Sequence, residues 1–268
     1  MNIHTHPIVV RHRARPREIR IAQDRLNLSP RSALKRAKKL EQLYAGRLRG
    51  IARIIGQIIA GYDLTDPTIV VPLIRAHLER YAQILQPWAE AAGKRMIAEV
   101  AAADRQGWKK FAVTVGRAVE KEIQTAPTGI ATQESLQRQV NLITSLPREA
   151  AERVHELTVK GISEGKRYPE IAAEIMKTGH VTASRATLIA RTEVSRTATE
   201  FTRARAEHIG SEEFIWRTAK DSDVRPSHRK LDGKVFRWDA PPECDPGHHA
   251  LPGGIWNCRC FADPILKD

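Results

Sequence analysis

The sequence is poor in cysteine, in aromatic residues and in long apolar runs. It holds three Cys in 268 residues, all within 244–260, and an odd number of this kind does not make a disulfide framework. Aromatic residues make up 5%, so we expect the helices to pack through Ala, Leu, Ile and Val. No apolar run approaches the roughly 18 to 20 residues of a membrane span, and no apolar signal-peptide segment follows the N-terminal arginines. We therefore expect a protein of a cytoplasm-like compartment, neither membrane-spanning nor disulfide-stapled.

Acidic residues are scarce at the N-terminus. Of the formal net charge of +13, +11 falls on residues 1–53, which leaves +2 for the remaining 215 residues. A basic tail usually meets a polyanion, either nucleic acid or an acidic protein surface, although a solvated arm without a partner is the alternative. The residues predicted to contact DNA or an acidic partner are Arg11, Arg13, Arg15, Arg17, Lys35, Lys38 and Lys39.

The first half of the chain predicts a basic arm and then helices. Residues 1–28 lack hydrophobic periodicity, so we expect a flexible arm. Ser29-Pro30 is typical of a helix start, with Ser as the N-cap and Pro at the first helical position. Apolar residues then recur every three or four positions to Tyr62, which predicts a long basic amphipathic helix packed against another helix. This helix opens a helical region that we place at 29–128.

Glycine, proline and capping residues predict where the later helices break. We expect a kink or break near Gln86, separate helices on either side of Gly107, and a boundary at Thr125–Gly129. Pro147 is predicted to divide a helix, and Gly179 is predicted to close a short one. Thr182 is predicted to cap the next helix, which Gly210 stops.

Residues 211–265 predict short strands and turns in place of helices. Runs from Glu213 to Thr218 and from Lys234 to Trp238 are typical of strands, and Asp232-Gly233 is a tight-turn signal. The predicted fold class is therefore α+β, with a mostly helical N-terminal region followed by a small C-terminal α+β module with short strands. The module is placed at 129–268, with helices first and a short-stranded part at 211–265. This short-stranded part has little apolar mass of its own, so it must dock on the preceding helix or be stapled. Its predicted core is Trp216, Phe236, Trp238 and Trp256.

An ordered set of short motifs runs through this module. It comprises Ala190-Arg191-Thr192-Glu193, Trp216-Arg217-Thr218, Asp223, His228, Leu231-Asp232-Gly233-Lys234, Pro252-Gly253 and Asn257-Cys258-Arg259-Cys260. The set resembles the Mu F-like head-morphogenesis family of tailed bacteriophages, over roughly residues 150–265. The resemblance implies a structural, non-enzymatic minor head protein at or near the portal vertex, found in the virion and assembled in the host cytoplasm. It also implies portal and other head proteins as partners. The charge of the basic arm indicates packaged DNA or an acidic surface of the portal or scaffold as its partner, and the lack of a long apolar run predicts no membrane partner.

Cysteine and histidine in the module raise the question of a metal. His228, Cys258 and Cys260, with Cys244 or His249 as a fourth group, are residue types that can form a tetrahedral zinc site. The Cys-x-Cys spacing is tighter than the usual two-residue spacer. A cluster of buried polar side chains that bond loop backbone is the competing interpretation, so no cofactor is predicted and zinc stays the alternative.

Four charged residues are predicted to anchor the module: Arg191, Glu193, Asp223 and Arg259. Arg191 and Glu193 point to different faces of one helix and cannot pair well. Glu193 is expected to accept hydrogen bonds from turn N–H groups or from Arg259, with an exposed helix face as the alternative.

Catalysis is the competing class of function. His228, Asn257 and Asp223 fit a metal-dependent nuclease or a DNA-binding effector that uses the His/Cys module. No second His follows Asn257 at a short spacing, and no Ser–His–Asp order, P-loop or dinucleotide fingerprint is present. The structural role is therefore the prediction.

Overall fold

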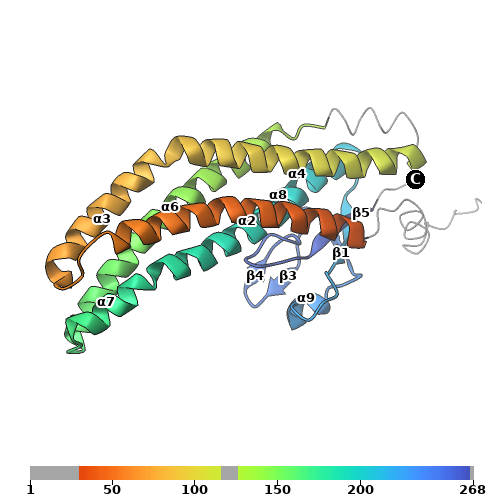
Figure 1. The fold of residues 1–268 in the computed structure, drawn as a ribbon. Helices are drawn as coiled ribbons and strands as arrows, with labels where there is room; N and C mark the ends of the chain where they lie inside the picture. The colour runs from red at the N-terminus through yellow and green to blue at the C-terminus, as the bar shows by residue number, and fades with distance from the viewer. Residues whose placement is uncertain (1–29, 116–125, 266–268) are drawn as a thin grey trace, which may run out of the picture.

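Long helices form an elongated bundle that carries a small stranded module beside one end (Figure 1). The computed structural model describes residues 30–115 and 126–265. The helices of the bundle are α2 (Pro30–Ala60), α3 (Pro67–Ile84), α4 (Gln86–Val115), α6 (Gly129–Ser163), α7 (Tyr168–Met176) and α8 (Thr178–His208). They precede a small part with short antiparallel strands, which confirms the predicted fold class. No helix in the described ranges is long and apolar enough to cross a membrane.

The predicted apolar stripe of α2 is buried in the bundle. Tyr44, Leu48 and Ile55 are fully buried, and they join a core that also takes Ile143 from α6 and Ile189 from α8. In sequence order the helices α2, α3–α4, α6 and α7–α8 run back and forth along the bundle (Figure 1). This core is continuous on both sides of residue 129, where the sequence divides the helical region from the module.

One predicted helix break, near Gln86, is correct, and two others, at Gly107 and Pro147, are wrong. α3 ends at Ile84 and α4 begins at Gln86, so the break expected near Gln86 is confirmed. Gly107 and Pro147 instead lie inside α4 and α6. Pro147 is buried in the bundle, and packing along an uninterrupted apolar face outweighs a proline penalty of about 3 kcal/mol.

Gly179 and Thr182 are also interior residues, so the predicted closure and cap are wrong. α8 begins at Thr178, and the Thr182 hydroxyl donates to the Thr178 carbonyl inside the helix. A Cβ on Gly179 would lie 3.2 Å from the Cα of Gly56, so these glycines let α2 and α8 approach closely. Gly179 thus serves helix packing in place of helix termination.

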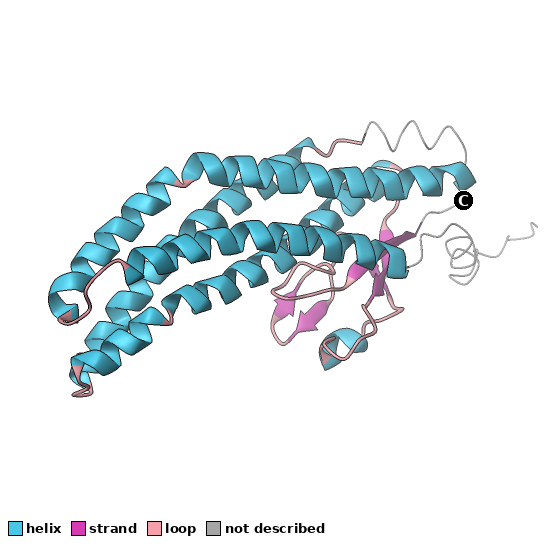
Figure 2. Cartoon of the chain, viewed as in Figure 1, coloured by secondary structure: helices cyan, strands magenta, loops and turns pink. Residues whose placement is uncertain are grey.

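Gly210, with φ +83°, ends α8 and turns the chain into the strands, as predicted. β1 (Glu213–Arg217) lies between β2 (Val235–Arg237) and β5 (Phe261–Ile265) in an antiparallel sheet. β3 (Glu243–Asp245) pairs with β4 (His248–His249), and α9 (Pro226–Arg229) is a single turn. The strands gather in one small region beside the bundle (Figure 2).

The core of the module is aromatic. Phe214 and Trp216 of β1 are fully buried, and Trp238 is 2% exposed. Phe236 is partly buried against them. The prediction that Trp256 belongs to this core is wrong, because it is 41% exposed and its ring lies under the Arg185 guanidinium, 4.8 Å from the ring centroid.

Candidate functional site

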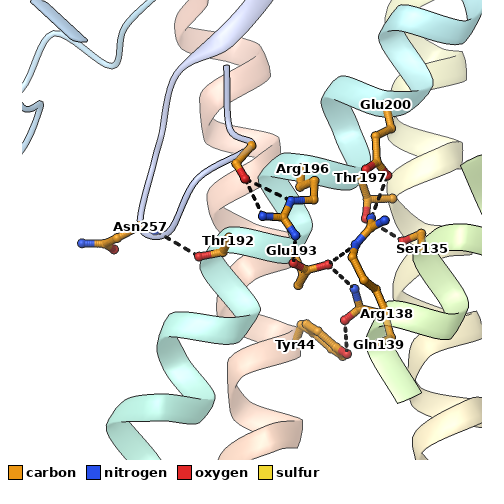
Figure 3. A network of polar contacts seen from close by, with 11 residues as sticks. Tyr44, Ser135, Arg138, Gln139, Thr192, Glu193, Arg196, Thr197, Glu200 and Asn257 are labelled. Atoms are coloured by element: carbon orange, nitrogen blue, oxygen red, sulfur yellow. Dashed lines mark hydrogen bonds and ion pairs between the residues drawn. The ribbon is translucent and has the colours of Figure 1, made fainter. Parts of the chain in front are cut away.

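A buried carboxylate lies where the bundle meets the module (Figure 3). Glu193 of α8 is 0% exposed, and its two oxygens accept three hydrogen bonds from side chains. Oε2 accepts from Arg138 Nε at 3.1 Å and from Gln139 Nε2 at 2.7 Å, both on α6. Oε1 accepts from Arg196 Nη1 at 3.0 Å, one turn further along α8. The charge is therefore fully partnered by two helices.

Further polar groups extend this network through the bundle. The Tyr44 hydroxyl of α2 donates to Gln139 Oε1 at 2.8 Å, and Arg138 Nη2 donates to Glu200 Oε2 at 2.8 Å. Burial, and to a smaller extent the negative charge of Glu193, raise the pKa of Tyr44. Burial also raises the pKa of Glu200. The phenol consequently stays protonated as a donor, and α2, α6 and α8 are joined at one level of the bundle.

Side chains at the same level of α8 also form hydrogen bonds with the loop before β5. Arg196, which pairs with Glu193, also donates to the Gly254 carbonyl, with Nε at 3.1 Å. The Thr199 hydroxyl donates to the Pro252 carbonyl at 2.7 Å, and the Thr192 hydroxyl accepts from the Asn257 backbone N–H at 3.0 Å. Residues 252–257 are thus bonded directly to one face of α8.

The four predicted anchoring residues divide into two groups. Arg191 bonds across the junction, with Nη1 2.5 Å from Asn257 Oδ1 and Nε 2.9 Å from Glu41 Oε1. Arg259 donates to Asp221 and Asp223 at 2.8 Å each, so this pair orders a loop within the module.

Glu193 was expected to accept hydrogen bonds from turn N–H groups or from Arg259, but its donors in the described residues are others. It is linked to the module through Arg196. Its donors among the described residues are side chains of α6 and α8. Arg196, one turn after Glu193, was visible in the sequence as an i+3 partner. Arg138 and Gln139 carry no local signal, since they lie more than fifty residues away in the chain.

A second cluster lies inside the module. His228 Nδ1 is 3.5 Å from Cys258 Sγ and 3.4 Å from Cys260 Sγ, and all three side chains are buried. The backbone N–H groups of Gly253 and Cys260 donate to Cys258 Sγ at 3.3 and 3.4 Å. Hydrogen bonds from the Cys260 thiol and, to a smaller extent, from His228 lower the pKa of Cys258 below its ordinary value.

The two other proposed ligands lie apart from this cluster. Cys244 is buried, but its thiol donates to the His248 carbonyl at 3.3 Å. His249 is exposed, with Nδ1 3.2 Å from the Pro241 carbonyl oxygen. The structure therefore brings three of the candidate ligands together.

A cavity of about 480 Å³ opens between α2, α4, α8 and β5. Its wall includes apolar side chains such as Val194 and Phe261, and the predicted residues Lys38, Arg191 and Arg259 also line it. The arrangement of an apolar wall with charged residues is typical of a binding surface.

The predicted polyanion contacts are only partly within the described residues. Arg11, Arg13, Arg15 and Arg17 lie outside them, and Lys35 belongs to the first turns of α2. Lys38 and Lys39 are exposed on α2, as are Arg49 and Arg53 further along the helix. The exposed cations thus follow the outer surface of α2.

The chain resembles known proteins in both parts of the fold. Residues 152–262, from α6 to β5, match the family described as Phage Mu protein F like protein. The chain is 23% identical over 245 residues to "Minor head protein GP7" of Bacillus phage SPP1, covering 83% of this chain and 80% of that protein. No solved structure is significantly similar.

Two longer, uncharacterized proteins are similar to a part of the chain. One from Haemophilus influenzae is 33% identical over 129 residues, which cover 48% of this chain and 28% of that protein. One from Methanocaldococcus jannaschii is 35% identical over 111 residues, which cover 41% of this chain and 17% of that protein. This chain therefore matches less than a third of either relative.

Removing the central carboxylate tests the junction. Glu193→Ala is expected to lower the free energy of unfolding by roughly 3 to 5 kcal/mol, because Arg138 and Arg196 lose a buried counter-charge. Glu207→Ala, which removes a half-exposed ion pair with Arg203 on the same helix, should change it by no more than about 0.5 kcal/mol. Urea unfolding of both variants measures the difference, and similar losses would contradict a special role for Glu193.

Proposed function

Because residues 152–262 belong to the Phage Mu protein F like family, we propose that the chain is a structural minor head protein of a tailed bacteriophage, acting in head assembly at or near the portal vertex. The main support is the similarity to the SPP1 minor head protein, which extends over 83% of this chain. That length takes in helices of the bundle as well as the module. The chain is accordingly assigned to the phage head in the virion, with assembly in the host cytoplasm.

Burial of the His/Cys cluster supports a structural role over a nuclease. His228, Cys258 and Cys260 are 2%, 2% and 4% exposed. A phosphodiester must come within bonding distance of a catalytic metal or base, and these side chains offer it almost no surface. The polar groups of the junction are likewise occupied with one another. We therefore assign no catalytic residue.

The partners follow from the family and from the charge. Portal protein and other head proteins are the proposed protein partners. Packaged DNA is the proposed partner of the basic N-terminal residues, together with Lys38 and Lys39 on the exposed surface of α2. Exposed lysines bind phosphates by releasing counterions, without reading the base sequence.

Analysis of phage heads tests the proposed role. Purified heads of the encoding phage are expected to contain the chain in few copies relative to the major capsid protein, and the chain should co-purify with the portal ring. Heads assembled with the Glu207→Ala variant should retain it, because that ion pair is half exposed. Absence of the wild-type chain from both heads and portal complexes would overturn the proposal.

Charge reversal on α2 tests the DNA contact. Lys38→Glu combined with Lys39→Glu should weaken binding to duplex DNA and lower the slope of log K against log salt by roughly 2, about one unit per lost phosphate contact. Lys94→Glu combined with Lys109→Glu reverses two exposed lysines of α4 and serves as the control. Equal effects of the two double variants on the salt slope would show that overall charge, and not this surface, governs binding.

A further inference from the structure

We propose that His228, Cys258 and Cys260 form a zinc site that holds the terminal module together. The inference does not depend on the proposed function. It rests on three ligand atoms, His228 Nδ1 and the two Sγ atoms, that lie within 4.8 Å of one another in the interior.

The spacing of these atoms suits a tetrahedral metal. Zinc–sulfur bonds of about 2.3 Å and zinc–nitrogen bonds of about 2.0 to 2.1 Å place a nitrogen and a sulfur ligand roughly 3.6 Å apart. The distances from His228 Nδ1 to the two sulfur atoms are 3.5 and 3.4 Å. An ion can therefore be bound with little movement of the three side chains.

The surroundings of the ligands fit metal binding as well. His228 Nε2 is buried without a hydrogen-bond partner among the described residues and faces Asp245 Oδ1 at 3.8 Å. A histidine that binds a metal through one nitrogen commonly turns the other toward a carboxylate. The Ser227 hydroxyl, at 2.6 Å, fixes that same oxygen of Asp245.

The two N–H groups directed at Cys258 Sγ, from Gly253 and Cys260, suit a thiolate. On binding, each thiol releases its proton to solvent and donates a sulfur lone pair to the zinc, so no oxidant or reductant takes part. Cys244 lies in the same apolar core but outside this three-atom cluster, with its thiol bonded to the His248 carbonyl, so three protein ligands are assigned.

A metal here would compensate for the small size of the module. His228 lies on α9, Cys258 in the loop before β5, and Cys260 directly before β5, so one ion would join three segments. The His228 ring packs edge-on against Trp216 at 5.5 Å between centroids, which links the site to the aromatic core. Short-stranded modules of this kind often depend on a staple of this type.

Metal analysis of the purified full chain tests the proposal. The wild-type chain is expected to bind about one zinc, while His228→Ala and Cys258→Ser should bind almost none. His249→Ala, which removes an exposed histidine of the same module, should keep the full zinc content. Zinc in equal amounts in His228→Ala and His249→Ala would overturn the assignment.

Cobalt supplies a readout that does not require the variants to fold. Wild-type chain stripped with a chelator and titrated with Co²⁺ should show thiolate-to-metal charge-transfer absorption and tetrahedral d–d bands, saturating at about one ion per chain. Its thermal midpoint should fall after chelation and recover with Zn²⁺. Absence of charge-transfer absorption, with a thermal midpoint that chelation leaves unchanged, would contradict a structural metal.

Discussion

The packing of α2, α6, α8 and the terminal module depends on one buried negative charge, the carboxylate of Glu193. An ionised carboxylate without partners in the interior costs several kcal/mol, so its donors must be in place when the chain folds. Those donors are Arg138 and Gln139 on α6 and Arg196 on α8. Moving α6 along α8 would remove the two donors to Oε2, and removing Arg196 from the junction would remove the donor to Oε1. The network therefore fixes the register of the helices more than it adds to the total stability.

α8 is the element that the bundle and the module share. Its buried Ile189 belongs to the helical core, whereas Thr192, Arg196 and Thr199 bond the loop before β5. The family match, residues 152–262, takes in α8 whole together with the strands up to the start of β5. Such an arrangement lets the small sheet use a 31-residue helix as its support, which is what a module with a limited core of its own requires.

Local patterns in the sequence predicted the parts of the fold that local physics controls. The spacing of Tyr44, Leu48 and Ile55 predicted the buried face of α2. The β-type run from Glu213 to Thr218 and the alternation from Lys234 to Trp238 predicted β1 and β2. Helix interruptions were overpredicted, because proline and glycine costs of about 1 to 3 kcal/mol are smaller than the packing gained along the bundle. The partners of Glu193 on α6 could not be predicted, since no local periodicity links contacts 54 and 55 residues apart. Residue types alone identified His228, Cys258 and Cys260 as candidate ligands. They could not show that the thiol of Cys244 is bonded to the His248 carbonyl.

The central claim, that Glu193 couples the bundle to the module through Arg196, is tested most directly by a double-mutant cycle. Urea unfolding would be measured for Glu193→Ala, Arg196→Ala and the double variant. The double variant is expected to lose less stability than the sum of the single variants, with a coupling of roughly 1 to 3 kcal/mol. Additive losses, within about 0.5 kcal/mol, would contradict it.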